Sequence, residues 1–163
     1  MAPTKTNIIV CGTSVQLKVG GTDVGYTAGG VELELADEHY DVIADQSLTP
    51  VLRKLTARTC KVRTTMLEAT LENLRLAWNL ADTALVSSSL TLNSSEKGEV
   101  AVVFVGKGPG TTVTRTATFF AAVAMATGPI PNFKDKESQI PVEFECLWSD
   151  TNSAFGTIVD ASS

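Results

Sequence analysis

The stretch that decides the fold class of this chain is Val142-Glu143-Phe144-Glu145-Cys146-Leu147-Trp148. Apolar side chains at 142, 144, 146 and 148 alternate with glutamates at 143 and 145, and this period of two is typical of a strand with one buried face. The same alternation occurs over 15–19 and 31–35. Paired glycines at 20–21 and 29–30 supply the positive φ angles that tight connections need, so residues 7–35 are expected to form an antiparallel meander.

Further strands are expected over 100–105, 111–126 and 155–160, and the glycine-rich segment 106–110 is expected to be a hairpin turn. A single helix is predicted over residues 67–80, because Leu67, Leu71, Leu74 and Trp78 have helical spacing and Thr65-Met66-Leu67-Glu68 has the form of a capping box. Composition predicts loops over 82–99 and 128–139. We therefore predict one domain over 1–163, mainly β: an antiparallel sandwich or rolled barrel with one flanking α-helix.

Composition and charge exclude several classes of protein. The 163 residues are 44% hydrophobic and 19% charged, as in an ordinary globular domain. A net charge of −5 argues against a nucleic-acid-binding surface, which requires clustered lysine and arginine. The longest uncharged stretch, 116–133, is interrupted by glycine and proline and is too short for a membrane span of about 20 residues. The first residues lack the features of a secretory signal, so cytosolic synthesis is expected.

The cysteines are Cys11, Cys60 and Cys146, an odd number without any Cys-x-x-Cys pair. This spacing predicts neither a disulfide framework nor a zinc site. Buried free thiols are the favoured interpretation, because free cysteine is among the most buried residue types. A disulfide between subunits is the less favoured alternative.

No constellation in the sequence predicts catalysis. His39 is the only histidine, and its neighbours Asp37, Glu38 and Asp41 favour a salt-paired or surface imidazole over a general base. The acidic run 37–45 departs from the calcium-loop pattern, and 106–112 departs from the phosphate-loop order. We expect no enzyme activity, no cofactor and no metal.

Charge is segregated along the chain. No lysine or arginine occurs from 19 to 52, where the acids are Asp23, Glu32, Glu34, Asp37, Glu38, Asp41 and Asp45. No acid occurs from 46 to 67, where the bases are Arg53, Lys54, Arg58, Lys61 and Arg63. Opposite signs in neighbouring segments suit cross-strand pairs within one chain, pairs between copies of it, or solvated strand faces.

Several stretches, taken in order, carry a family likeness: Gly21-Thr22-Asp23-Val24-Gly25, Gly29-Gly30-Val31-Glu32-Leu33-Glu34, Tyr40-Asp41-Val42, Asp45-Gln46-Ser47, Pro50-Val51, residues 62–80, Ile140 to Leu147 and Phe155-Gly156-Thr157-Ile158. Together they resemble the phage tail tube (major tail) proteins, and the likeness touches nearly the whole chain. The resemblance implies a β-sandwich or rolled barrel with one helix and an N-terminal arm over 1–6. It also implies hexameric rings that stack into a hollow tube.

The same resemblance implies the partners. These are further copies of the chain, the tape measure protein inside the tube, tail terminator and baseplate or distal tail proteins and, in contractile tails, a sheath. DNA passes through the lumen without specific binding, no membrane is involved, and the protein ends in the virion tail after assembly in the host cytoplasm. An acidic lumen suits this passage, because basic linings retain DNA.

Two groups of residues are candidates for these roles. Glu32 and Glu34, which share one strand face, are the candidates for the lumen lining. In the family a long hairpin reaches the neighbouring ring, and it corresponds to residues 36–55 here. Its charges are expected to pair between subunits and to be weakened by salt; the ring-stacking candidates are Asp37, Glu38, Asp41, Asp45, Arg53, Lys54 and Arg58.

Two alternatives remain open at this level. A type VI secretion tube protein shares the fold and is separated from a phage protein only by the wording of the motifs. A small β-sandwich binding module is of a different class, and it usually exposes aromatic residues for stacking. Here Trp78 and Trp148 both lie on predicted core faces, which disfavours the binding module.

Overall fold

The computed structural model describes residues 5, 8–9, 15–110, 112–126, 128–130 and 136–162. The predicted N-terminal arm over 1–6, apart from Lys5, and Cys11 therefore lie outside the described residues. The same holds for the central part of the predicted loop 128–139.

The described residues are mainly β, as the sequence predicts, and their strands pair antiparallel. The strands are β1 (Gln16–Val19), β2 (Thr22–Asp23), β3 (Thr27–Val42), β4 (Leu52–Met66), β5 (Leu85–Val86), β6 (Ser89–Leu90), β7 (Val100–Lys107), β8 (Val113–Ala126), β9 (Ile140–Cys146) and β10 (Gly156–Ser162). One helix, α1 (Leu71–Ala77), and a short 3-10 turn, η2 (Asp82–Ala84), complete the described elements. The arrangement agrees with the predicted sandwich with one flanking helix.

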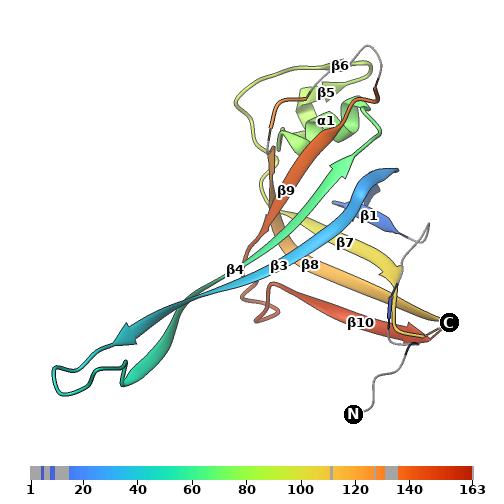
Figure 1. The fold of residues 1–163 in the computed structure, drawn as a ribbon. Helices are drawn as coiled ribbons and strands as arrows, with labels where there is room; N and C mark the ends of the chain where they lie inside the picture. The colour runs from blue at the N-terminus through green and yellow to red at the C-terminus, as the bar shows by residue number, and fades with distance from the viewer. Residues whose placement is uncertain are drawn as a thin grey trace.

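A single sheet contains all the strands except β5 and β6, in the order β2-β1-β7-β8-β9-β4-β3. The long strand β8 has β7 on one edge and two partners in succession on the other. Its residues 113–119 pair with β10, and its residues 122–126 pair with β9. The sheet therefore divides at this point, and β9, β4 and β3 diverge from β10 (Figure 1).

One apolar cluster fills the inside of the curved sheet. Side chains from β1, β4, β7, β8, β9 and α1 meet in it, and among the fully buried ones are Leu17, Val62, Phe144 and Ile140. The alternation predicted for residues 142–146 is present in β9, since Val142, Phe144 and Cys146 lie in this cluster. The alternation of apolar and polar residues therefore places these side chains in the core, as expected.

The helix is shorter than the predicted 67–80, because α1 begins at Leu71 and ends at Ala77. The expected capping box is not formed, since Thr65 and Met66 are the last residues of β4. The hydroxyl oxygen of Thr70 caps the helix instead, accepting a hydrogen bond from the backbone N–H of Asn73 at 3.2 Å. The side-chain amide of Asn73 donates to the carbonyl oxygens of Val24 and Glu68. These two bonds hold the chain before the helix against the segment that follows β2.

Neither tryptophan lies in the core, which corrects the prediction for both. Trp78 is the C-terminal cap of α1 and is 38% exposed, and Trp148 is 56% exposed. Trp148 follows the end of β9 at Cys146, where the strand alternation no longer sets which face a side chain takes. Its ring instead packs edge-on against Phe155, with centroids 5.5 Å apart.

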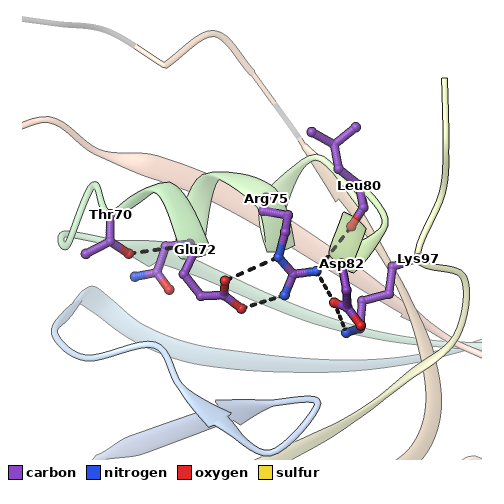
Figure 2. A network of polar contacts seen from close by, with 7 residues as sticks. Thr70, Glu72, Arg75, Leu80, Asp82 and Lys97 are labelled. Atoms are coloured by element: carbon purple, nitrogen blue, oxygen red, sulfur yellow. Dashed lines mark hydrogen bonds and ion pairs between the residues drawn. The ribbon is translucent and has the colours of Figure 1, made fainter. Parts of the chain in front are cut away.

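The segment predicted as the loop 82–99 contains η2 and the small β5–β6 hairpin. Arg75 of α1 ties it to the helix (Figure 2), and its side chain is almost fully buried. The guanidinium donates to the carboxylates of Glu72 and Asp82 and to the carbonyl oxygen of Leu80, and Asp82 also pairs with Lys97. This network fixes the helix to the turn that follows it.

Candidate functional site

A two-stranded arm projects from the sheet. β4 pairs with β9 only from Cys60 to Met66, so from Ala36 to Thr59 the strands β3 and β4 pair with each other alone. We call residues 36–59 the arm. It extends well away from the rest of the protein (Figure 1) and includes the hairpin predicted over 36–55.

Cross-strand ion pairs connect the two strands of the arm. The guanidinium of Arg58 donates two hydrogen bonds to the carboxylate of Asp37, at 2.5 and 2.7 Å, and Arg53 contacts Asp41 in the same way at 2.7 and 2.8 Å. These arginine hydrogen bonds hold the pKa of each aspartate below its ordinary value. Thr56 is the extra residue where the register shifts, and its hydroxyl donates to the carbonyl oxygen of Glu38 at 3.1 Å.

Four of the seven ring-stacking candidates are therefore paired within the chain: Asp37, Asp41, Arg53 and Arg58. This arrangement is the cross-strand alternative for the segregated charges. The other three candidates are Glu38, Asp45 and Lys54, which make no ion pair with any described residue. They are the candidate charges that have no ion-pair partner among the described residues.

The arm also exposes apolar side chains, which sequence reasoning missed. Leu48 is fully exposed at the tip and Ile43 is 70% exposed. Others along both strands are exposed as well: Tyr40, Val42, Val51, Leu52 and Leu55. The reason is strand length, which the sequence alone does not give: β3 and β4 have 16 and 15 residues, far more than the usual 5–6 or so. Where two strands extend beyond the neighbouring strands of the sheet, no core packs against their apolar residues.

The predicted lumen candidates lie on the strand face opposite to the core. Glu32 is opposite Arg63 and Glu34 is opposite Lys61 in the β3–β4 ladder. Glu34 forms an ion pair with Arg63 at 2.6 Å, and both cations also contact the nearly buried Glu143 of β9. We call this cluster the acidic face, because four carboxylates meet two cations; its residues are Glu32, Glu34, Lys61, Arg63, Glu143 and Glu145.

Apart from the two-residue strand β2, two strands of the large sheet have one edge open among the described residues. β3 pairs on one side only, with β4, and β10 pairs on one side only, with β8. An open edge presents backbone N–H and C=O groups that can pair with a strand of another chain. The two edges belong to different strands of one chain, so they suit a head-to-tail contact between copies.

A groove of about 470 Å³ opens where the arm leaves the body. Leu33, Leu35 and Cys60 line it from the arm side, and Trp148, Phe155 and Ile158 are among the residues that line the other side. Leu33 and Leu35 belong to the face of β3 that continues the core, because they pair with Val62 and Cys60. The groove is therefore an extension of the core that reaches the surface.

His39 lies on the arm opposite Leu55, and the described residues include no group of three or more His, Cys, Asp and Glu arranged to hold a metal ion. The helix that is described is too short to cross a bilayer. A comparison with protein-family models found no match, and neither did one with curated proteins.

Proposed function

We propose that this chain is a structural subunit of a phage tail tube, in which hexameric rings stack into a hollow conduit for genome delivery. The observation that carries the proposal is the arm, which exposes apolar side chains to water far from the core. Exposed apolar surface of this extent marks a protein contact. A second copy is the partner that a ring-forming subunit always meets.

The two open strand edges support association around a ring. Pairing of the β3 edge of one copy with the β10 edge of the next joins their sheets through backbone hydrogen bonds. The contact is heterologous, and a heterologous contact closes into a ring when its rotation divides a full turn. The arms then reach along the axis to the adjacent ring.

The acidic face supports the assignment of Glu32 and Glu34 to the lumen. Lys61 and Arg63 compensate half of the negative charge of its four carboxylates, so the acidic face keeps a net negative charge. A lining of this kind repels phosphate groups and so lets DNA pass without being retained. The tape measure protein, terminator, baseplate proteins and sheath belong to the same proposal as contacts of the tube.

Negative-stain electron microscopy of the purified protein tests the proposal. Hollow rings or tubes are expected at high protein concentration. The double variant Ile43→Asp/Leu48→Asp places charge on the arm tip and is expected to leave rings without stacked tubes. Its control is Leu92→Asp, which changes a side chain that is 72% exposed on the body and is expected to assemble like the parent.

The outcomes separate the possibilities. A protein that stays monomeric at high concentration contradicts the tube and favours a binding module. Tubes that form equally well in the tip variant contradict the role of the arm while leaving the ring in place. Circular dichroism of both variants checks that the substitutions leave the fold intact.

A further inference from the structure

Two thiols face each other at the root of the arm. Cys60 of β4 and Cys146 of β9 are direct partners in the antiparallel ladder, and they form its last pair before β4 leaves the sheet. Both are free and buried, with 6% and 3% of their surface exposed. We propose that Cys60 and Cys146 are an oxidation site, at which a hydroperoxide joins the two strands by a disulfide.

The geometry of the ladder favours this bond. Residues directly opposite in antiparallel strands have Cα atoms about 4.5–5.5 Å apart. Disulfides join cysteines whose Cα atoms are about 4.4–6.8 Å apart, so the Cα spacing of a directly opposed pair falls within the range of a disulfide. The two side chains also lie on the same face of the sheet, since both belong to the apolar core cluster.

The groove at the root of the arm gives a small oxidant access. Cys60 is one of its lining residues, together with Leu33, Leu35 and Trp148. Cys146 does not line it. Cys60 is therefore the thiol that the oxidant meets first, and Cys146 is the resolving thiol.

The chemistry is a two-step exchange. The Cys60 thiolate attacks one oxygen of hydrogen peroxide, the O–O bond breaks, and a sulfenic acid and water result after one proton is taken up. The Cys146 thiolate then attacks the sulfenic sulfur, the S–O bond breaks, and the departing hydroxide takes up a proton and leaves as a second water. Two thiols are oxidised by two electrons and one peroxide is reduced to two waters.

Burial controls the rate of this reaction. It raises the pKa of both thiols above the ordinary value of 9.0, so little thiolate exists at neutral pH. Oxidation is therefore expected to be slow near pH 7 and to become faster as the pH rises toward 9. The site is therefore expected to form its disulfide slowly and not to respond rapidly to an oxidant.

The experiment treats the folded full-length protein with hydrogen peroxide at pH 7 and pH 9. The expected result is an intact mass lower by two hydrogen atoms, a Cys60–Cys146 cross-linked peptide on mapping, and faster reaction at pH 9. Oxidised protein should also show a higher midpoint of thermal unfolding and slower hydrogen exchange in β4 next to Cys60. The variants Cys60→Ser and Cys146→Ser should form no such peptide, and Cys11→Ser should still form it.

Three outcomes would overturn the proposal. Thiols at 60 and 146 that persist under native conditions but react once the chain is unfolded show that no oxidant enters. Sulfinic or sulfonic acid at Cys60, seen as a gain of oxygen, shows that Cys146 does not resolve the intermediate. Covalent dimers or a disulfide to Cys11 show that pairing in the β4–β9 ladder does not determine which cysteine reacts with Cys60. None of these results depends on whether the chain forms tubes.

Discussion

At the scale of single residues, Arg75 is the most constrained charge among the described residues. Its side chain is 5% exposed, whereas its partners Glu72 and Asp82 are 34% and 69% exposed. The guanidinium was removed from water on folding, and its hydrogen bonds to two carboxylates and the Leu80 carbonyl offset that cost. The pairing is therefore a structural connection between α1 and the following turn.

Replacing Arg75 with methionine is expected to lower the free energy of unfolding by about 2 kcal/mol, because hydrogen bonds to charged groups contribute roughly 1.5–3 kcal/mol. Denaturant unfolding followed by circular dichroism measures the change. The control is Arg53→Met, which breaks a bidentate pair whose arginine is 65% exposed, and its effect should be much smaller. Equal losses in the two variants would contradict the role of burial.

The sequence showed that the charges are segregated but did not decide where they pair. The acids of 19–52 and the bases of 46–67 pair across β3 and β4 within one chain, which is one of the alternatives that the segregation left open, whereas the charges of the hairpin were expected to pair between subunits. The register could not be read, because the bulge at Thr56 shifts the strands by one residue between Glu38 and His39. A shift of this kind depends on local backbone geometry and leaves no periodic signal.

At the scale of elements, β10 is held against β8 by a close backbone approach. A Cβ atom at Gly156 would lie 2.3 Å from the carbonyl oxygen of Thr118 and 2.9 Å from the Phe119 ring. Backbone cannot move aside as a side chain can. Glycine is therefore required where β10 begins its ladder with Phe119.

Gly156→Ala is expected to separate the start of β10 from β8 and to lower the free energy of unfolding by about 1–3 kcal/mol, as overpacking usually does. Hydrogen exchange should accelerate in residues 156–159. Thr157→Ala, a change at the next and exposed residue, serves as the control and should have little effect. Unchanged exchange in the glycine variant would show that the strand can shift to accommodate a methyl group.

Elements with a strong period were predictable, and their ends were not. The strands β7, β8, β9 and β10 all lie where alternation or turn residues predicted them. The helix was placed too early, because the leucine spacing over 67–78 does not reveal that Leu67 donates its N–H to the carbonyl oxygen of Tyr26. That long-range contact keeps residues before Thr70 out of the helix.

At the scale of the whole molecule, carboxylates with lowered pKa values link distant parts of the chain. Hydrogen bonds from Lys61 and Arg63 lower the pKa of Glu143, and those from Arg115 lower the pKa of Asp160. Asp82 behaves in the same way through Lys97 and Arg75. In each case the folded state favours the ionised carboxylate more than the unfolded chain does.

Stability is therefore expected to be nearly constant above about pH 6 and to fall as the pH drops through 4.5 and 3.8, the ordinary values for glutamate and aspartate. Below these values the unfolded chain binds more protons, and the loss continues until the folded carboxylates are protonated as well. Denaturant unfolding between pH 7 and pH 3 measures the curve. Glu143→Gln should flatten it, whereas Glu145→Gln, which changes a neighbour that has no ion pair with any described residue, should not.

The candidate site was predictable in its position but not in its chemistry. The segment 36–55 could be identified from its charges and from the family resemblance. Its exposed apolar side chains could not, because Ile43 and Leu48 read as ordinary core residues until the strands are seen to extend beyond the sheet. Exposure follows from the lengths of neighbouring strands and is a property of the whole fold.

The arm acts mechanically as a lever. From Cys60 to Leu52 it measures about 26 Å, at ~3.3 Å per residue. A rotation of about 10° at its root carries the tip about 5 Å, which is roughly the spacing between neighbouring strands. The last residue pairs of the β4–β9 ladder therefore set the direction of the whole arm, and a few degrees there move the tip by about the width of one strand.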